Sequence, residues 1–193
     1  MCCRELFPNS RALFMHRDFI KQAKSFYRIS YQAPVLCLAY SLGPLTGRVL
    51  ERFISRFGQD GKQFRIRLNN DFQLGVTLSA VTTMYYLDLR RKGLNVTAIR
   101  YEDLVANPVE MCQQILEYCR LPEALVGAAM RGFEVDSQRN SILSRKMIGN
   151  CPEPELTECV KNSLNELLMK FPGVPLIGSE CIVEGTMRPT SSR

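Results

Sequence analysis

The sequence is poor in the residues that build metal sites. It has a single histidine, His16, and none of its eight cysteines belongs to a C-x-x-C pair. Zinc sites of the Cys/His type need such spacings, so we expect no metal site. No run of 18 apolar residues occurs, which predicts the absence of a membrane-spanning helix. The first residues, MCCRELFPNSR, also lack the apolar stretch of a signal peptide.

Charge of one sign is nowhere concentrated in the sequence. Lys and Arg number 25 against 19 Asp and Glu, a net charge of +6, yet no run of five like charges occurs. The excess favours a polyanionic partner such as a nucleic acid, a phosphorylated or sulfated ligand, or a membrane surface. Scattered basic residues are equally typical of a plain solvated surface. Because no basic run is interleaved with aromatic residues, we expect no nucleic acid partner.

The composition is that of an ordinary globular protein, with 46% hydrophobic and 23% charged residues. A chain of 193 residues suits one domain with a sizeable core. The cysteines are spread along the whole sequence, which favours reduced thiols over a disulfide framework. They are Cys2, Cys3, Cys37, Cys112, Cys119, Cys151, Cys159 and Cys181.

Apolar runs and turn residues follow one another in the order of an α/β protein. The run 12–15 predicts a short strand, and Asp18 is placed to N-cap the helix that follows. A helix over 78–92 is expected to end at Gly93, before a strand over 95–100. This succession is typical of a short parallel sheet flanked by helices. Further helices are expected from Pro108 to Leu121, over 123–131 and over 156–171, with a loop over 132–150.

Arg17 and Ser25 are the first candidates for binding. Arg17 follows the predicted strand, and Ser25 comes eight residues later, about two turns into the helix. Parallel α/β sheets bind anions where a strand ends and a helix begins. An arginine and a hydroxyl so placed could hold one phosphate. The alternative is an arginine that pairs with Asp18 and a serine on a solvated helix face.

Two segments of this chain together resemble the P-loop-type sulfotransferases. The segment 7–27, FPNSRALFMHRDFIKQAKSFY, is similar to the family's 3′-phosphate-binding segment, where a strand ends in Arg and a Ser follows eight residues later. The segment 94–108, LNVTAIRYEDLVANP, is similar to a second recurring segment: a buried strand, Tyr-Glu-Asp-Leu, and a Pro that opens a helix. The resemblance implies a partial P-loop NTPase-like fold over 1–178, truncated at its N-terminus. The remaining residues, 179–193, are expected to form a flexible tail.

The resemblance also implies roles for single residues. Arg17 and Ser25 would bind the 3′-phosphate of the sulfate donor, 3′-phosphoadenosine 5′-phosphosulfate, and Tyr101 would lie beside its adenine. Otherwise Tyr101 is a half-buried tyrosine at a strand end. The family closes over the 3′-phosphate with a basic loop late in the chain. Ser141 and Arg145 are the candidates for this loop, with an ordinary surface loop as the alternative.

Other polar residues near these candidates are expected to be structural. Glu102 and Asp103 are adjacent on a stretch expected to be extended, so they would point in opposite directions. We therefore predict that they cap the helix after Pro108 or bind a backbone N–H, and do not form an acid–base pair. His16 is expected to be structural, because family members with a histidine base place it well before the strand that ends in Arg.

One part of the family's pattern is missing from this sequence. Nothing matches G-x-x-x-x-G-K-[ST] or the family's Lys-Ser-Gly-Thr variant. That loop holds the 5′-phosphosulfate, and its Lys stabilises the leaving phosphate. The nearest segment, 43–47, lacks the Lys. We therefore assign no catalytic residue, and we expect this chain alone to transfer sulfate weakly or not at all.

Three interpretations stay open at this point. The chain is a sulfotransferase-family protein whose complete relatives transfer sulfate to a hydroxyl or amine, or a non-catalytic nucleotide-binding or interaction protein of the same fold, or a fragment that a missing N-terminal portion completes. The acceptor has no readable motif. A missing central strand would leave an unpaired sheet edge, which favours self-association. The cytoplasm is favoured over the Golgi lumen.

Overall fold

The computed structural model describes residues 9–32, 71–135 and 155–190. These residues divide into two compact units. The first contains the described residues of Met1–Arg17, Tyr86–Asp136 and Ile182–Arg193, and the second those of Asp18–Tyr85 and Ser137–Cys181. The last boundary between the two units falls at 181/182, and the single domain expected over 1–178 stays a prediction.

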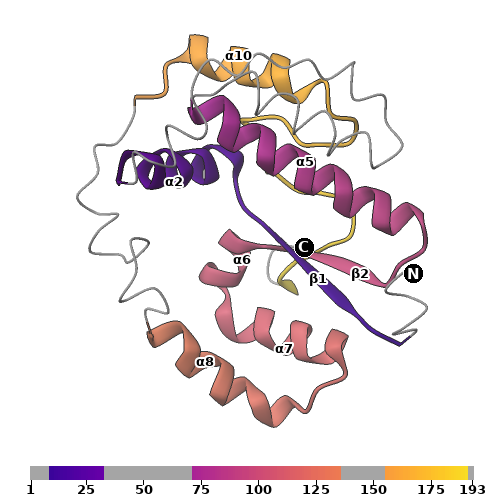
Figure 1. Cartoon of the computed structure of the whole chain (residues 1–193). Helices are drawn as coiled ribbons and strands as arrows, with labels where there is room; N and C mark the ends of the chain where they lie inside the picture. The colour runs from indigo at the N-terminus through magenta and orange to yellow at the C-terminus, as the bar shows by residue number, and fades with distance from the viewer. Residues whose placement is uncertain (1–8, 33–70, 136–154, 191–193) are drawn as a thin grey trace. The chain divides into compact units, whose positions relative to one another are not determined.

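The first unit is built on a three-stranded parallel sheet. Its order is β1 (Ala12–His16), β2 (Val96–Arg100) and β3 (Thr186–Met187). β1 and β2 lie side by side (Figure 1), in a register that pairs Ala12 with Val96 and His16 with Arg100. The strands predicted over 12–15 and 95–100 are confirmed, as is their parallel arrangement.

β3 corrects the expectation of a flexible tail over 179–193. Thr186 and Met187 pair with Ala98 and Ile99 of β2, and Val183 is buried just before them. The backbone of Gly185 accepts hydrogen bonds from the Ala98 amide and from the Thr97 hydroxyl. The pairing depends on contacts with residues almost 90 positions earlier in the chain, so nothing local in the polar tail sequence indicates it.

Helices cover both faces of this sheet. On one face, Phe14 and Ala98 pack against Tyr86 and Leu87 at the end of α5 (Asp71–Arg91), and the Phe14 and Tyr86 rings stack with centroids 4.7 Å apart. On the other face, Ile99 packs against side chains of α6 (Tyr101–Ala106) and α7 (Pro108–Cys119). The chain is therefore a mixed α/β protein with a short parallel sheet flanked by helices.

Local signals determine the helix ends that the sequence predicted. Gly93 has φ +72°, its amide donates to the Arg90 carbonyl, and the Leu94 amide donates to the Leu89 carbonyl. This is the Schellman pattern that a glycine after the helix favours. Pro108 is the first residue of α7, as expected. η2 (Glu123–Leu125) and α8 (Val126–Glu134) then occupy the region predicted to be helical over 123–131.

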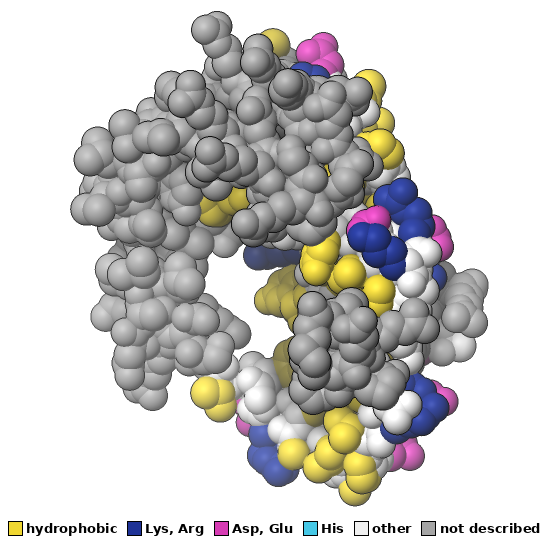
Figure 2. Space-filling model, turned by 45° about the vertical axis from the view of Figure 1, so that its right-hand side comes forward, with side chains coloured by type: hydrophobic (Ala, Val, Ile, Leu, Met, Phe, Trp, Pro, Cys, Tyr) yellow, Lys and Arg dark blue, Asp and Glu magenta, His cyan; other side chains and the backbone are white. Residues whose placement is uncertain are grey.

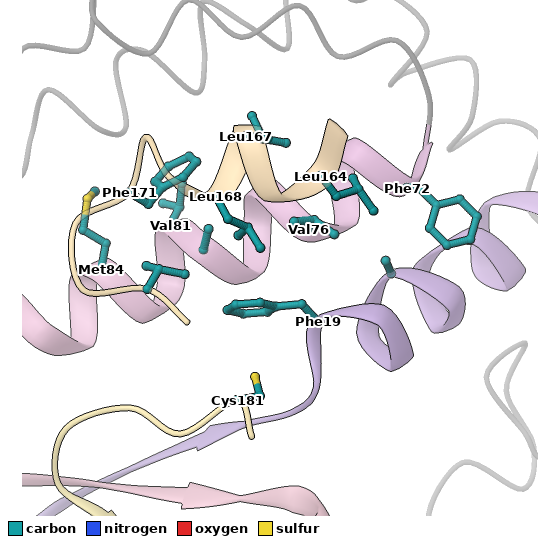
Figure 3. Close-up of a cluster of buried hydrophobic side chains, with 13 residues drawn as sticks. Phe19, Phe72, Val76, Val81, Met84, Leu164, Leu167, Leu168, Phe171 and Cys181 are labelled. Carbon is teal, nitrogen blue, oxygen red and sulfur yellow. The ribbon is translucent and has the colours of Figure 1, made fainter. Parts of the chain in front are cut away.

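The second unit is an apolar helical cluster of α2 (Phe19–Gln32), residues of α5 and α10 (Glu158–Leu168). Figure 3 shows Phe19 of α2 facing Val76 of α5 and Leu168 of α10. Gly75 lets α2 and α5 approach closely, because a Cβ there would lie 3.0 Å from the Ala23 Cα. The predicted N-cap of α2 is confirmed, since an Asp18 carboxylate oxygen accepts from the Lys21 amide at 3.0 Å.

Several predicted boundaries and orientations are wrong. α5 begins at Asp71, seven residues before the expected start at 78, because Phe72 and Val76 gain burial in the helical cluster. The stretch after β2 is helical (α6), not extended. Asn107, not Glu102 or Asp103, is the N-cap residue of α7.

Candidate functional site

The carboxyl ends of β1 and β2 bring together residues that lie far apart in the sequence. The pairing of His16 with Arg100 places the next residues, Arg17 and Tyr101, at the same edge of the sheet. The Arg17 guanidinium carbon lies 4.9 Å from the centre of the Tyr101 ring, a cation–π contact. Tyr101 is 39% exposed, so a ligand can reach this edge. Two of the residues selected from the sequence are therefore in contact.

Glu102 lies between two arginines at this edge. Its Oε1 is 3.8 Å from the Arg17 Nε, and its Oε2 is 3.7 Å from the Arg100 Nε. Arg100 also donates from Nη1 to the Asp103 Oδ1 at 3.3 Å. Two guanidinium groups thus face two carboxylates, and the formal charges of these four side chains cancel. We refer to Arg17, Arg100, Glu102 and Asp103 as the strand-end charge cluster.

The helical conformation of α6 explains the position of both carboxylates. Glu102 and Asp103 occupy its first turn, directly after Arg100, which is its N-cap residue. In a helix, a residue and the third one after it lie on one face, so Asp103 returns to Arg100. The expected cap for the helix after Pro108 is therefore wrong. Both carboxylates are arginine partners.

His16 is buried at the end of β1, with 5% of its surface exposed. Its Nε2 lies 3.2 Å from the Thr186 Oγ1. The Thr186 hydroxyl already donates to the Val183 carbonyl at 2.7 Å, so its oxygen accepts from the imidazole and the proton lies on Nε2. Because Thr186 belongs to β3 and β2 lies between β1 and β3, this contact joins the two outer strands of the sheet.

The pKa of His16 is lowered from 6.5 to about 4. The largest cause is burial, and the charge of Arg100 lowers it further, while the charge of Glu102 raises it. The imidazole is therefore neutral at pH 7, with a buried Nδ1 that has no hydrogen-bond partner among the described residues. Burial and the contact with Thr186 agree with the structural role expected for His16.

Of the other predicted binding residues, one belongs to the second unit and two lie outside the described residues. Arg17 belongs to the first unit and Ser25, on α2, to the second, so the structure does not bring them together within one compact unit. Ser141 and Arg145 lie outside the described residues. The three residues that sequence reasoning missed as parts of the site are Arg100, Glu102 and Asp103. Arg100 precedes Tyr101 at the end of a predicted strand, the same signal that identified Arg17.

Charges of both signs are mixed among the described residues on the face that Figure 2 draws. On the face drawn in Figure 2, Lys and Arg side chains lie beside Asp and Glu side chains. Within the described ranges, no three His, Cys, Asp or Glu residues are grouped as a metal site requires. The described helices also include none that is both long and apolar enough to cross a bilayer.

Comparisons with known proteins give no family for this chain. No protein-family model, no curated protein and no solved structure matches it. The geometry of the strand-end charge cluster and the resemblance carried by the sequence segments are therefore the grounds for a functional proposal.

Proposed function

We propose that this chain binds a 3′-phosphorylated adenine nucleotide at the carboxyl ends of β1 and β2, as sulfotransferases of the P-loop type bind their sulfate donor. One observation carries the proposal: the Arg17 guanidinium lies 4.9 Å from the Tyr101 ring centre, at the ends of two adjacent parallel strands. In open parallel α/β sheets, ligands bind outside the carboxyl ends of the strands. The resemblance had assigned these two residues to the 3′-phosphate and to the adenine.

In this proposal the two residues act together. The guanidinium of Arg17 donates charge-assisted hydrogen bonds to the 3′-phosphate. The Tyr101 ring fixes the guanidinium and offers an aromatic edge to the adenine. Ser25 and the late loop with Ser141 and Arg145 are proposed to complete the phosphate site. The P-loop NTPase-like fold is part of the same proposal.

The proposal is limited to binding. Arg17 and Tyr101 would contact the 3′-phosphate and the base, and neither group touches the 5′-phosphosulfate bond that breaks during sulfate transfer. Transfer to a hydroxyl or amine is a property of complete relatives, for which the donor is a co-substrate. For this chain we propose a nucleotide-binding role, the second of the interpretations that the sequence left open.

Isothermal titration calorimetry with 3′-phosphoadenosine 5′-phosphate tests the proposal directly. We expect the wild-type chain to bind and Arg17→Ala to lose about 30- to 150-fold in affinity, the equivalent of ~2–3 kcal/mol for a charge-assisted phosphate contact. Arg131→Ala is the matched control, because it removes an exposed arginine of α8 in the same unit.

Either of two results would overturn this proposal. A folded wild-type chain that does not bind the nucleotide has no donor site. Equal losses in the Arg17 and Arg131 variants would mean that net charge alone attracts the ligand. Titration at two salt concentrations separates attraction by net charge from a local contact, because interactions between exposed charges weaken as the ionic strength rises.

A further inference from the structure

We propose that Arg17 and Arg100 together bind one phosphate or sulfate group, and that Glu102 occupies this arginine pair in the ligand-free chain and is displaced when the anion binds. The part played by Arg17 rests on the function proposed above. The inference adds Arg100 as a second binding residue and Glu102 as an internal competitor, which makes the site responsive to anions.

The first observation is the shape of the cluster. The two carboxylate oxygens of Glu102 each face a different guanidinium, at 3.8 Å from the Arg17 Nε and 3.7 Å from the Arg100 Nε. Arginine binds carboxylates and phosphates with the same planar fork, so a site built for one accepts the other. Glu102 therefore stands where two oxygens of a tetrahedral anion would bridge the arginines.

The second observation is the length of the two separations between the Glu102 carboxylate and the arginines. Both separations exceed the usual hydrogen-bond range of about 2.7–3.2 Å. The Arg100 Nε is buried and has no hydrogen-bond partner within the described part of the chain. A buried donor without an acceptor is unfavourable, so an anion that approaches Arg100 more closely would gain a contact that Glu102 does not make.

The third observation concerns charge. Two arginines and two carboxylates leave the cluster neutral, and Asp103 keeps its own hydrogen bond to the Arg100 Nη1. A phosphate that bound while Glu102 stayed in place would lie beside a like charge. Glu102 is in the first turn of α6, and 15% of its side chain is exposed. The inference requires that Glu102 leaves the pair by rotation of its side chain while both arginines stay at the strand ends.

The test compares wild type with Glu102→Gln, a change that removes the charge and keeps the shape. Inorganic phosphate and 3′-phosphoadenosine 5′-phosphate are added in separate titrations. Binding is measured from the NMR signals of the amides and of the imidazole of His16, the single histidine. We expect Glu102→Gln to bind both probes about tenfold more tightly than wild type. Glu117→Gln is the control, since it removes an exposed charge from α7 in the same unit.

Two further variants keep the test decisive if Glu102→Gln folds poorly. Glu102→Asp retains the charge on a shorter side chain, and we expect its phosphate affinity to lie between those of wild type and Glu102→Gln. Arg100→Gln placed in the Glu102→Gln chain should return the affinity for phosphate to the wild-type value or below. The His16 signal shows directly whether each variant keeps the folded first unit.

The outcomes separate this inference from the proposed function. If wild type binds the nucleotide through Arg17 but the Glu102 variants bind phosphate no more tightly, the inference is overturned and the proposed function stands. If no variant binds the nucleotide but Glu102→Gln binds phosphate through Arg100, the proposed function falls and the arginine pair stands. Weaker binding by Glu102→Gln would mean that Glu102 orients the arginines, which also overturns the inference.

Discussion

The apolar cluster of the second unit and the strand ends of the first unit both contain buried atoms, but the two regions differ in what those atoms need. In the helical cluster, side chains such as Val76 and Leu168 are completely buried and need only contact. At the strand ends, the Arg100 Nε and the His16 Nδ1 are buried without a hydrogen-bond partner among the described residues. Apolar burial has no direction, whereas a polar group requires one particular partner. The comparison separates a region whose buried groups need only contact from one whose buried polar atoms keep unused hydrogen-bonding capacity.

The largest effect should follow from breaking the apolar side of this comparison. Leu168 of α10 has no exposed surface, so Leu168→Ala leaves a cavity and should destabilise the chain by about 2–5 kcal/mol. Urea unfolding measures the change. Leu121→Ala is the control, because that side chain is 50% exposed and should cost less than about 1 kcal/mol. Equal costs for both variants would mean that the cluster does not act as a core.

At the strand ends, the buried histidine His16 predicts that stability depends on pH. Its folded pKa of about 4 lies below the ordinary 6.5, so between these pH values the unfolded chain binds a proton that the folded chain does not. His16 therefore contributes stability above pH 6.5 that is lost as the pH falls towards 4, on the order of 3 kcal/mol.

Unfolding of wild type and His16→Phe by urea at pH 7 and at pH 4.5 measures this contribution. Phenylalanine keeps a flat ring but cannot ionise, so the stability of the variant should fall less between the two pH values. NMR titration of the single imidazole gives the pKa itself. A midpoint near 6.5 would show that the ring is hydrated, and the expected difference between the two chains would vanish.

A smaller effect on stability is expected at two helical glycines, one in a packed environment and one in an open environment. In Gly75→Ala the new Cβ would lie 3.0 Å from the Ala23 Cα and 3.2 Å from the Phe26 Cβ, so we expect a loss of about 1–2 kcal/mol despite the better helix propensity. Gly132 of α8 has nothing within 4 Å of the same position, and Gly132→Ala should stabilise by about 0.5–1 kcal/mol. Thermal unfolding measures the change in stability for both variants. We expect the two changes to have opposite signs, and changes of the same sign would contradict the prediction.

Much of the fold follows from short segments of the sequence. Asp18 is an N-cap, Gly93 ends α5 and Pro108 opens α7, each by contacts within a few residues. The strands β1 and β2 follow from their apolar runs. The same reasoning failed where burial by distant residues decided the outcome. The early start of α5 depends on the helical cluster, and β3 depends on an edge of β2 that no tail residue reveals.

The candidate site divides in the same way. Arg17 could be selected because it follows a recognisable strand, and Tyr101 because its segment resembles the second recurring sulfotransferase segment. Parallel pairing of the two strands then makes the two residues neighbours. Arg100 and Glu102 were not selected, because their role depends on a register, His16 beside Arg100, and on the helical turn of α6. A one-residue slip in pairing would move these side chains to other partners.

By itself, then, the sequence determined the local elements, their order and the residues placed at strand ends, because caps, turns and hydrophobic periodicity act over a few residues. Only the tertiary structure decided which strand ends lie together, which charges compensate each other and that His16 is neutral. Those properties depend on the distances between side chains in the folded chain and on how deeply the side chains are buried. They arise only when segments more than 80 residues apart, such as β1 and β2, pack against each other.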